Sequence, residues 1–489
     1  MRVLIDTNVF VYGETDKVVE SDVAKLAALA MEHDVQLFVH PASLEDIGRD
    51  ADESRRIIHE SKFKKYPILQ DSGNPDANFT SIVGKPSIPQ DEVDNRILYS
   101  AYKNAVNFFV TEDLGIHRKA RKLDLSERVL TVSQAVEYLR RQFERYIPEH
   151  LTLEHLEIYR LDLQSEFFDG LREDYPDFNE WFIEKSREGR MCWCLRDKEE
   201  NLKALLIYAE KNKQTFRDHP EPALKLCTFK VADEAKGLKM GELLLKMCFE
   251  YCSKNGLSAA YLTTFEKQTH LRILLEDFGF VEIGKKSKGE LLYAKDFVAP
   301  SDLNDMRPLE YCKRFFPEFY DGNEVRKFVV PIRPEFHDRL FADARVRQTS
   351  IDEFASGVVE QNTIKKAYVC KAPIKKIRSG DILLFYRSKR NKGITGIGVV
   401  ESVLRRPSSF DDLIAFIGPR SVYAEDELQE LHKTGALAIL FRYVGQLPSF
   451  ISRERLFELK ILKAAPRTII SMENVQYNQL NGDDEGWLT

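Results

Sequence analysis

The stretch Met1–Phe10, MRVLIDTNVF, decides the fold of the first third of the chain. An apolar run at residues 3–5 is followed at once by Asp6. A short apolar run that ends in a polar turn predicts a buried strand of an α/β sheet. Asp6 is then expected at the carboxyl end of that strand, where open parallel sheets bind their ligands. A carboxylate is costly to bury there unless it is paired or binds a metal, so we expect further acids to converge on it.

The composition predicts a soluble, cytoplasmic protein of several domains. A chain of 489 residues is too long for one core, and three domains are expected. The net charge of −6 excludes a generally basic protein, so any nucleic-acid surface must be local. Seven cysteines at irregular spacing favour a reducing compartment, and Cys192 and Cys194 favour packing over zinc binding. Neither a membrane span nor a signal peptide is expected.

Further acids in residues 1–146 occupy positions similar to that of Asp6. Glu45 and Asp46 follow Ser43 in the first turn of an expected helix, after an expected strand at residues 35–39. Asp94 opens another expected helix, and Asp113 ends a strand that begins at residue 107. Acids at strand ends and helix starts of one sheet fit a single Mg²⁺ or Mn²⁺ site.

This first segment resembles a PIN domain, a family of metal-dependent ribonucleases that includes many toxins of toxin–antitoxin pairs. The matching motifs are L-I-D-T-N at residues 4–8, D-x-x-I-L from Asp94, and T-x-D ending at Asp113. The resemblance implies an α/β/α fold and a catalytic, metal-binding set of Asp6, Asp46, Asp94 and Asp113. Either Glu45 or Asp46 takes the place of the second acid, and Asp46 is preferred because an aliphatic residue follows it.

The implied chemistry is phosphodiester hydrolysis with one or two divalent ions. Thr7, Asn8 and Thr111 would orient the acidic ligands. The alternative is a nuclease that has lost its activity, in which the acids only cap helices.

A second segment, residues 150–298, carries a loop suited to a pyrophosphate. A strand at residues 224–231 leads through the loop Lys236–Gly241 into an apolar helix. Backbone N–H groups at such a loop and helix start can bind an anion. The arrangement resembles the GNAT acetyltransferases, in which Q/R-x-x-G-x-G/A holds the pyrophosphate of acetyl-CoA. The resemblance implies α+β folding and a cofactor-binding set: Val231, Lys236, Gly237, Leu238, Lys239, Met240 and Gly241.

Two departures from the GNAT pattern affect the expected chemistry. Lys239 replaces the middle glycine of the loop, and Leu275 stands where family members often carry a proton-donating tyrosine. Candidate substitutes for that tyrosine are Tyr261, Glu266 and Cys227. A GNAT-like module that binds acetyl-CoA without transferring the acetyl group is therefore kept as an alternative.

The last third combines an expected linker at 299–324, a domain at 325–475 and a tail at 476–489. Many Lys and Arg residues between 365 and 406 are interleaved with aromatic residues, a pattern suited to single-stranded RNA. Gly380-Asp381 and residues 396–398 (G-I-G) resemble the PUA-like superfamily with its ASCH, EVE and YTH domains. The resemblance implies a β barrel that binds RNA or a modified base. The candidate RNA-binding residues are Tyr368, Arg378, Tyr386, Arg387, Lys389 and Arg390.

Together these features predict a multidomain α/β and α+β protein that processes RNA, with tRNA among the possible substrates. It would combine a Mg²⁺- or Mn²⁺-dependent endoribonuclease, an acetyl-CoA-dependent N-acetyltransferase and an RNA-binding domain, in a toxin-like or defence setting. One rival is an N-acetyltransferase whose inactive PIN domain only delivers substrate. The other is a non-catalytic nucleic-acid-binding regulator that senses acetyl-CoA. The RNA, the acyl acceptor, the oligomeric state and any inhibitor are left open.

Overall fold

The computed structural model describes residues 1–14, 21–70, 72–144, 151–211, 222–286, 289–300, 306–341, 362–389 and 392–483. The chain divides into two compact units, which are described separately. The first unit contains residues 1–147 together with residues 406–419, and the second contains residues 148–405 and 420–489. Within the described residues the strands form three sheets, one in the first unit and two in the second. No helix in this part of the chain is long and apolar enough to cross a membrane.

The first unit is built on a parallel sheet of four strands in the order β2-β1-β3-β4, as far as the described residues show. The strands are β1 (Arg2–Ile5), β2 (Gln36–Phe38), β3 (Phe108–Val110) and β4 (Val129–Leu130). The helices are α1 (Thr7–Gly13), α2 (Ser21–Glu32), α3 (Ser43–Gly48), α4 (Glu53–Phe63), α5 (Ala77–Val83), α6 (Pro89–Tyr102), α7 (Leu114–Lys122), α8 (Val132–Phe143) and α16 (Phe410–Ile417).

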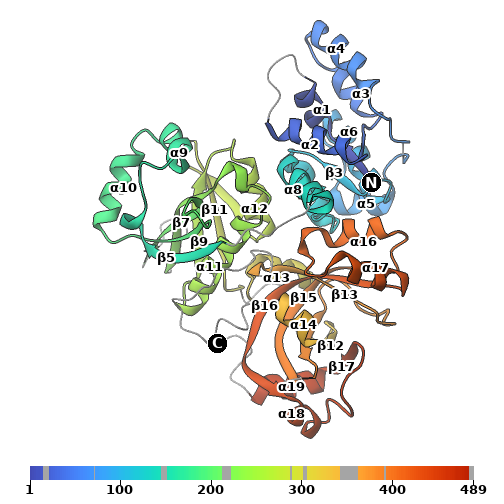
Figure 1. Cartoon of the computed structure of the whole chain (residues 1–489), viewed down its shortest axis with the longest axis vertical. Helices are drawn as coiled ribbons and strands as arrows, with labels where there is room; N and C mark the ends of the chain where they lie inside the picture. The colour runs from blue at the N-terminus through green and yellow to red at the C-terminus, as the bar shows by residue number, and fades with distance from the viewer. Residues whose placement is uncertain are drawn as a thin grey trace. The chain divides into compact units, whose positions relative to one another are not determined.

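Helices cover both faces of this sheet, so the expected α/β/α layering is confirmed (Figure 1). Leu4 and Phe109 pack with the buried side chains of α5, α6 and α7. On the opposite face the ring of Phe108 lies 4.4 Å from that of Tyr138 in α8. Strand side chains alternate between the two faces, which is why neighbouring residues of β3 enter different layers.

A segment from late in the sequence completes the first unit. Residues 406–419, which contain α16, group with residues 1–147. Asp411 of this helix lies 3.9 Å from the amino group of Met1, between a carboxylate oxygen and the terminal nitrogen. These residues were expected to belong to the domain at 325–475, and the structure corrects this: the C-terminal segment is interrupted by a helix that belongs to the first unit.

The second unit contains a seven-stranded sheet in the order β10-β11-β9-β8-β7-β6-β5 within the described residues. Its strands are β5 (Thr152–Glu157), β6 (Met191–Arg196), β7 (Leu202–Lys211), β8 (Ala223–Val231), β9 (Ala259–Thr264), β10 (Val281–Lys285) and β11 (Leu291–Asp296). The helices that accompany it are α9 (Asp169–Asp174), α10 (Phe178–Arg187), α11 (Met240–Lys254) and α12 (Thr269–Asp277). All neighbouring strands are antiparallel except β8 and β9, which pair in parallel.

The other sheet of the second unit has the order β13-β16-β15-β14-β12-β17. Its strands are β12 (Lys327–Ile332), β13 (Lys365–Cys370), β14 (Ile382–Arg387), β15 (Gly393–Arg405), β16 (Leu437–Ser452) and β17 (Ile470–Met472), with helices α13 (Pro308–Phe315), α14 (Pro334–Leu340), α17 (Glu425–Lys433), α18 (Arg453–Glu458) and α19 (Asn474–Asp483). The end strands β13 and β17 do not pair within the described residues, so closure into a barrel is not seen there.

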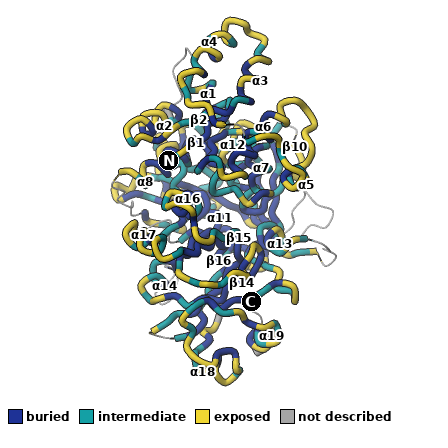
Figure 2. Tube along the Cα trace, turned by 90° about the vertical axis from the view of Figure 1, so that its right-hand side faces the viewer, coloured by how far each residue is buried: buried dark blue, intermediate teal, exposed yellow. Residues whose placement is uncertain are grey.

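Burial follows these sheets closely. In Figure 2 strands β14, β15 and β16 are mainly dark blue, whereas α4 and α18 are mainly yellow. Cys192 and Cys194 are fully buried in β6, in agreement with packing as their role.

Two segments expected as linker and tail carry packed structure. The linker at 299–324 contains α13, whose Leu309 and Cys312 are buried in the core of the second unit. Gly279 has a positive φ of 86°, and a Cβ there would lie 2.1 Å from the carbonyl oxygen of Lys313, so α13 approaches closely. The expected tail likewise begins inside α19, whose Tyr477 is fully buried. Residues 484–489 lie outside the described part.

Candidate functional site

Asp6 lies where the sequence places it, at the carboxyl end of β1 and the start of α1. Its side chain is 4% exposed. It accepts hydrogen bonds from the backbone N–H of Thr7 at 2.8 Å and from the hydroxyl of Thr111 at 2.6 Å. Asp6 therefore caps α1 while its second oxygen is held by the end of the neighbouring strand, β3.

Thr111 joins Asp6 to Asp113. Its Oγ1 also accepts a hydrogen bond from the backbone N–H of Asp113 at 3.0 Å. Asp113 caps α7 by accepting the N–H of Ile116 at 2.8 Å. The ends of the parallel strands β1 and β3 thus bring two of the expected acids to one edge of the sheet.

Asp46 and Asp94 are connected through Gln90, the second residue of α6. The side-chain amide of Gln90 donates to Asp46 at 2.9 Å and to Asp94 at 3.2 Å. Asp46 also accepts hydrogen bonds from Thr7 Oγ1 at 3.4 Å and from Arg49 at 2.6 Å. The position of Gln90 beside two of the acids was not expected from the sequence, since only the acids carried the family pattern.

Glu45 points to a different partner from Asp46. Its carboxylate is 49% exposed and pairs with Arg96 at 2.6 Å, whereas the side chain of Asp46 is 8% exposed. The hydrogen bond from Thr7 links Asp46, and not Glu45, to the start of α1. Of these two acids, Asp46 has the better position to act with Asp6.

The acids influence one another electrostatically. Burial, with contributions from Asp94 and Asp113, raises the pKa of Asp6 to about 7. Burial, with contributions from Asp113 and Asp46, raises the pKa of Asp94 to about 6. Burial also raises the pKa of Asp46. These carboxyls lose their protons less readily than usual because too little positive charge lies nearby. A divalent cation among them would lower their pKa values again.

The chemistry of these donors suits Mg²⁺ or Mn²⁺, which prefer carboxylate oxygens. As the side chains stand, no three His, Cys, Asp or Glu residues in the described part of the chain are arranged to hold a metal ion. Gln90 bonds to both Asp46 and Asp94, and Arg49 bonds to Asp46. Gln90 and Arg49 thus contact oxygens of Asp46 and Asp94 that would otherwise be available to an ion.

The loop Lys236–Gly241, which is expected to bind the coenzyme, lies after β8 and runs into the first turn of α11 in the second unit. Gly237 and Lys239 both have positive φ, 85° and 62°, and Lys239 occupies the residue before the helix in a left-handed conformation. The side chain of Lys236 pairs with Asp233 at 2.7 Å. Met240 is buried, so the contribution it can make to an anion is its backbone N–H at the helix start.

Gly241 has a packing reason to lack a side chain. A Cβ at this position would lie 2.7 Å from Cδ2 of Leu274 in α12. The glycine thus lets α12 pack against the first turn of α11, next to the loop. Val231 ends β8 and pairs with Ala204 of β7. The remaining expected residue, Leu238, is partly buried against the core.

The neighbouring strands β8 and β9 pair over only part of their length. The parallel pairing of β8 with β9 covers Ala223–Lys225 and Ala259–Tyr261, although both strands continue further. Tyr261 and Cys227 lie at or just beyond the last pair. Burial, with a contribution from Cys227, raises the pKa of Tyr261, and burial raises the pKa of Cys227.

The other residues considered for proton transfer are less well placed. Leu275 is fully buried, so the usual position of the proton-donating tyrosine is filled by core packing. Glu266 is exposed and pairs with Lys285 at 2.8 Å. Of the three candidate substitutes, Tyr261 and Cys227 lie at or just beyond the last pair of β8 and β9.

The basic and aromatic segment of the C-terminal region does not form one exposed strip. Tyr368 is 6% exposed and donates its hydroxyl to the carbonyl of Pro331, and Tyr386 is 1% exposed. Neither ring is available at the surface for stacking, which corrects the expectation for both. The reason is that both tyrosines lie on strands whose side chains fill the core.

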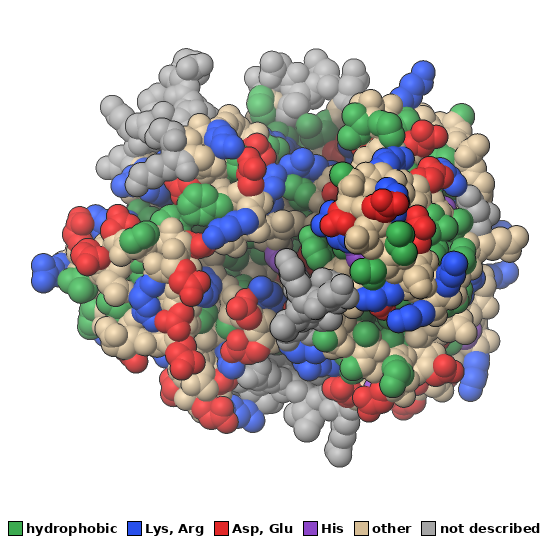
Figure 3. All heavy atoms as spheres, turned by 90° about the horizontal axis from the view of Figure 1, so that it is seen from above, with side chains coloured by type: hydrophobic (Ala, Val, Ile, Leu, Met, Phe, Trp, Pro, Cys, Tyr) green, Lys and Arg blue, Asp and Glu red, His purple; other side chains and the backbone are tan. Residues whose placement is uncertain are grey.

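The expected cations of this segment are divided between surface and interior. Arg378 and Lys389 are exposed, and Arg387 pairs with Asp338 at 3.1 Å. Arg390 lies outside the described residues. Lys365 and Lys366 are buried. On the face seen in Figure 3, Lys and Arg side chains are interspersed with Asp and Glu, without a broad area of one sign.

Comparisons with known proteins identify two domains. Residues 2–115 match the family model for the PIN domain, and residues 155–280 match that of the GNAT acetyltransferase family. The matches agree with the resemblances drawn from the sequence motifs. No curated protein shows a significant match to the chain.

Several solved structures align with parts of the chain. An ASCH protein from Zymomonas mobilis aligns at 16% identity with a TM-score of 0.24, covering 32% of this chain and 92% of that protein. A GNAT-family acetyltransferase from Staphylococcus aureus Mu50 aligns at 15% identity with a TM-score of 0.24, covering 30% and 99%. The PaiA N-acetyltransferase from Thermoplasma acidophilum, solved with coenzyme A, aligns at 12% identity with a TM-score of 0.23, covering 30% and 99%.

Proposed function

We propose that this chain, with a PIN domain at residues 2–115 and a GNAT-family domain at residues 155–280, is an RNA-directed enzyme whose first activity is metal-dependent ribonuclease action. The observation that carries the proposal is the convergence of Asp6, Asp94 and Asp113, where burial, together with the charges of neighbouring aspartates, raises the pKa of Asp6 and of Asp94. A helix cap needs only one carboxylate, whereas several buried carboxylates close together favour a cation-binding site.

The residues of this site have separable tasks. Asp6, Asp46, Asp94 and Asp113 would hold Mg²⁺ or Mn²⁺, which supplies an activated water and stabilises the leaving oxygen. Thr111 donates its hydroxyl to one oxygen of Asp6 and so fixes the orientation of that carboxylate. Gln90 bridges Asp46 and Asp94 through its side-chain amide and so sets the spacing of these two carboxylates.

The test compares Asp6→Asn with the wild type on total RNA in the presence of Mn²⁺ and in EDTA. The wild type is expected to cleave only with the metal, and the variant is expected to be inactive in both. Equal cleavage by both proteins would overturn the assignment. Glu45→Gln is the matched control because its carboxylate neighbours Asp46 in the sequence but pairs with Arg96.

The second domain supports a further candidate activity, acetyl transfer from acetyl-CoA to an amine. The candidate rests on the loop Lys236–Gly241 at the start of α11, which offers backbone N–H groups to an anion, and on β8 and β9, which pair over only part of their length. The amine nitrogen would attack the thioester carbonyl, the C–S bond would break, and CoA would leave as a thiol after receiving a proton. A tyrosine hydroxyl is protonated at pH 7, and Tyr261 lies at the last pair of β8 and β9, so it is the candidate donor of that proton.

A labelled-acetyl transfer screen with Tyr261→Phe separates this candidate from its non-catalytic alternative. Binding of acetyl-CoA with transfer that falls in the variant supports an acetyltransferase. Binding without transfer by the wild type supports a regulator that senses acetyl-CoA. RNA, including tRNA, is proposed as the shared target, with exposed Arg378 and Lys389 as contacts. A toxin-like or defence setting stays a prediction.

A further inference from the structure

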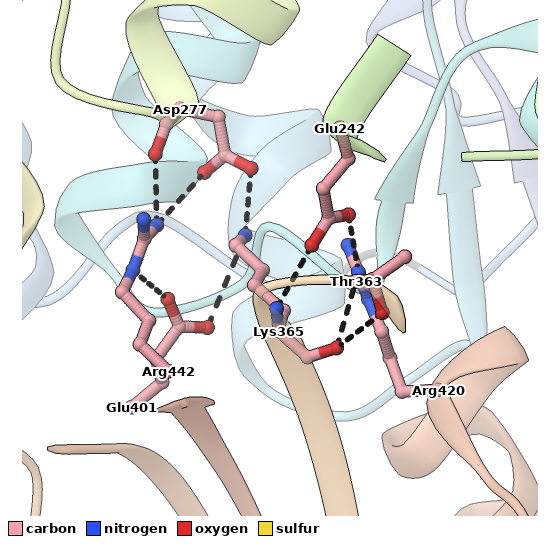
Figure 4. A network of polar contacts seen from close by, with 7 residues as sticks. All are labelled: Glu242, Asp277, Thr363, Lys365, Glu401, Arg420 and Arg442. Atoms are coloured by element: carbon pink, nitrogen blue, oxygen red, sulfur yellow. Dashed lines mark hydrogen bonds and ion pairs between the residues drawn. The ribbon is translucent and has the colours of Figure 1, made fainter. Parts of the chain in front are cut away.

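A buried ionic network lies within the second unit, where residues from the C-terminal region meet the GNAT-family domain (Figure 4). Its charged members are Glu242, Asp277, Lys365, Glu401, Arg420 and Arg442. Glu242 and Asp277 belong to the GNAT-family domain, and the other four lie on or near the sheet that contains β13, β15 and β16. The network therefore joins residues that are more than a hundred positions apart in the sequence.

Glu242 is the third residue of α11 and comes directly after the coenzyme loop. Its carboxylate accepts the backbone N–H of Lys365 at 2.8 Å and a guanidinium N–H of Arg420 at 2.5 Å. The side chains of Glu242 and Arg420 are 2% and 4% exposed. Removing one member of such a buried pair leaves the other charge without its partner in a poorly solvated place.

Lys365 connects the same region to α12. Its ammonium lies 2.6 Å from the carboxylate of Asp277, the last residue of α12. One residue of β13 thus holds the first turn of α11 through its backbone and the end of α12 through its side chain. These two helices also meet at Gly241, where Leu274 leaves no room for a Cβ.

The charge of Glu242 matters for an anion at the loop. The N-terminus of a helix attracts anions through its free N–H groups and dipole. A carboxylate in the first turn opposes that attraction, and the opposition is strong where water is excluded. Arg420 cancels this charge from within hydrogen-bond distance, so the field at the start of α11 stays favourable to phosphate groups.

We propose that Arg420 is a positioning residue of the coenzyme site, which neutralises Glu242 so that the pyrophosphate of acetyl-CoA can bind at the loop Lys236–Gly241. The proposal rests on the proposed binding of acetyl-CoA by the GNAT-family domain. It makes the C-terminal region a necessary part of that site, in addition to any role in RNA binding. It also predicts that removing the charge of Arg420 weakens coenzyme binding, whereas removing the charge of Glu242 strengthens it.

The test is calorimetric titration of the full chain with coenzyme A. Arg420→Met is expected to raise the Kd about tenfold to thirtyfold, because an uncompensated carboxylate remains beside the loop. Glu242→Gln is expected to lower the Kd by about threefold or more, because Arg420 then adds positive charge. A merely structural role for the pair predicts weaker binding in both variants, since each breaks the same contact.

Three further measurements complete the design. The double variant Glu242→Gln/Arg420→Met removes both charges and is expected to bind within about threefold of the wild type. Arg326→Met is the control, because it also removes the cation from a buried carboxylate, Asp381, elsewhere in the C-terminal region. Its Kd is expected to stay within about threefold of the wild type. Thermal melting of each variant establishes that it is folded.

The outcomes separate this inference from the proposed function. Binding to Arg420→Met within threefold of the wild type overturns the role of Arg420 and leaves acetyl-CoA binding intact. If Arg420→Met does not fold, Glu242→Gln decides, because weaker binding by that variant overturns the inference. Absence of coenzyme A binding by the wild type overturns both the inference and the proposed coenzyme.

Discussion

The aspartates of the PIN domain and the ionic network of the second unit are both clusters of buried charge, but they are balanced differently. Around Asp6 the neighbouring charges are negative, and the pKa values of Asp6 and Asp94 rise to about 7 and about 6. In the network each carboxylate meets a cation, and Lys365 and Arg442 overcome the effect of burial to lower the pKa of Glu401. The like charges around Asp6 support the proposed cation site, whereas the paired charges of the network connect α11 and α12 to β13.

The largest expected effect is on RNA cleavage. Asp94→Asn is expected to lower the rate with Mn²⁺ about a thousandfold, or about 4 kcal/mol in transition-state free energy, because a ligand of the ion is lost. A gel assay on a defined RNA measures it. The same assay with Asp91→Asn is the control, since Asp91 begins the same helix but bonds to Ser87 and Lys119. Comparable losses in both variants would show that the effect of Asp94→Asn does not come from the loss of an ion ligand.

The next effect is on the stability of the second unit. Arg442→Met is expected to lower its free energy of unfolding by about 3 kcal/mol or more, because Glu401 would remain buried with a lost partner. Urea unfolding followed by tryptophan fluorescence measures it, since Trp181 and Trp193 both lie in this unit. A loss below about 1 kcal/mol would mean that the network contributes little to the fold.

In the aspartate cluster, by contrast, the removal of a charge is expected to increase stability. Asp6→Asn should raise the stability of the metal-free first unit by roughly 2 kcal/mol at pH 8, because an ionised carboxylate is no longer buried among like charges. Hydrogen exchange of peptides from β1 and β3 in EDTA measures it. A decrease in protection would show that Asp6 acts mainly as a cap of α1.

The Asp6 carboxyl should also make the hydrogen-exchange protection of β1 and β3 depend on pH. The pKa of Asp6 is about 7 in the folded protein against an ordinary value of 3.8, so the folded state holds a proton between these values. Stability from this group is therefore full below pH 4 and falls as the pH rises to 7. Asp6→Asn should flatten this fall, and Mg²⁺ should oppose it in the wild type alone.

The smallest expected effect is a change in stability with pH that comes from His337, a buried histidine that stays uncharged. Burial, aided by Arg387, lowers the pKa of His337 to about 4, and its Nε2 bonds with the hydroxyl of Thr395 at 2.8 Å. As the pH falls, His337 takes up a proton in the unfolded chain before it does so in the folded protein. The free energy of unfolding of the second unit should therefore fall by about 1 kcal/mol between pH 7.5 and pH 5.5. Urea unfolding at the two pH values measures it. His337→Gln should reduce that difference, and an unchanged difference would contradict the assignment.

The sequence predicts most of the aspartate site because its positions are set locally. Asp6 and Asp113 end strands or begin helices, and those elements can be recognised from apolar runs and turns. Gln90 could not be predicted as their neighbour, because its amide meets Asp46 only after two distant helices pack. The expected α/β/α layering and the coenzyme loop are likewise local in origin.

The basic segment shows where local pattern fails. Lys365 and Lys366 read as surface charge when only the neighbouring residues are considered. In the structure both are buried, and Lys365 lies against Asp277 and Glu401. The partner of a charge is decided by tertiary packing, so the count of lysines along a strand cannot distinguish an RNA-binding surface from an internal ion pair.

The path of the chain into the first unit has a practical consequence for the isolation of the PIN domain. Because residues 406–419 group with residues 1–147, a gene fragment that stops at Ile147 omits α16. Such a fragment exposes the side chains that α16 covers and loses the neighbour of its own amino terminus, Asp411. A circularly permuted protein, or one in which a linker joins residues 1–147 to residues 406–419, would contain the whole unit. For the same reason, a single cut in the sequence does not separate the whole first unit from the rest of the chain.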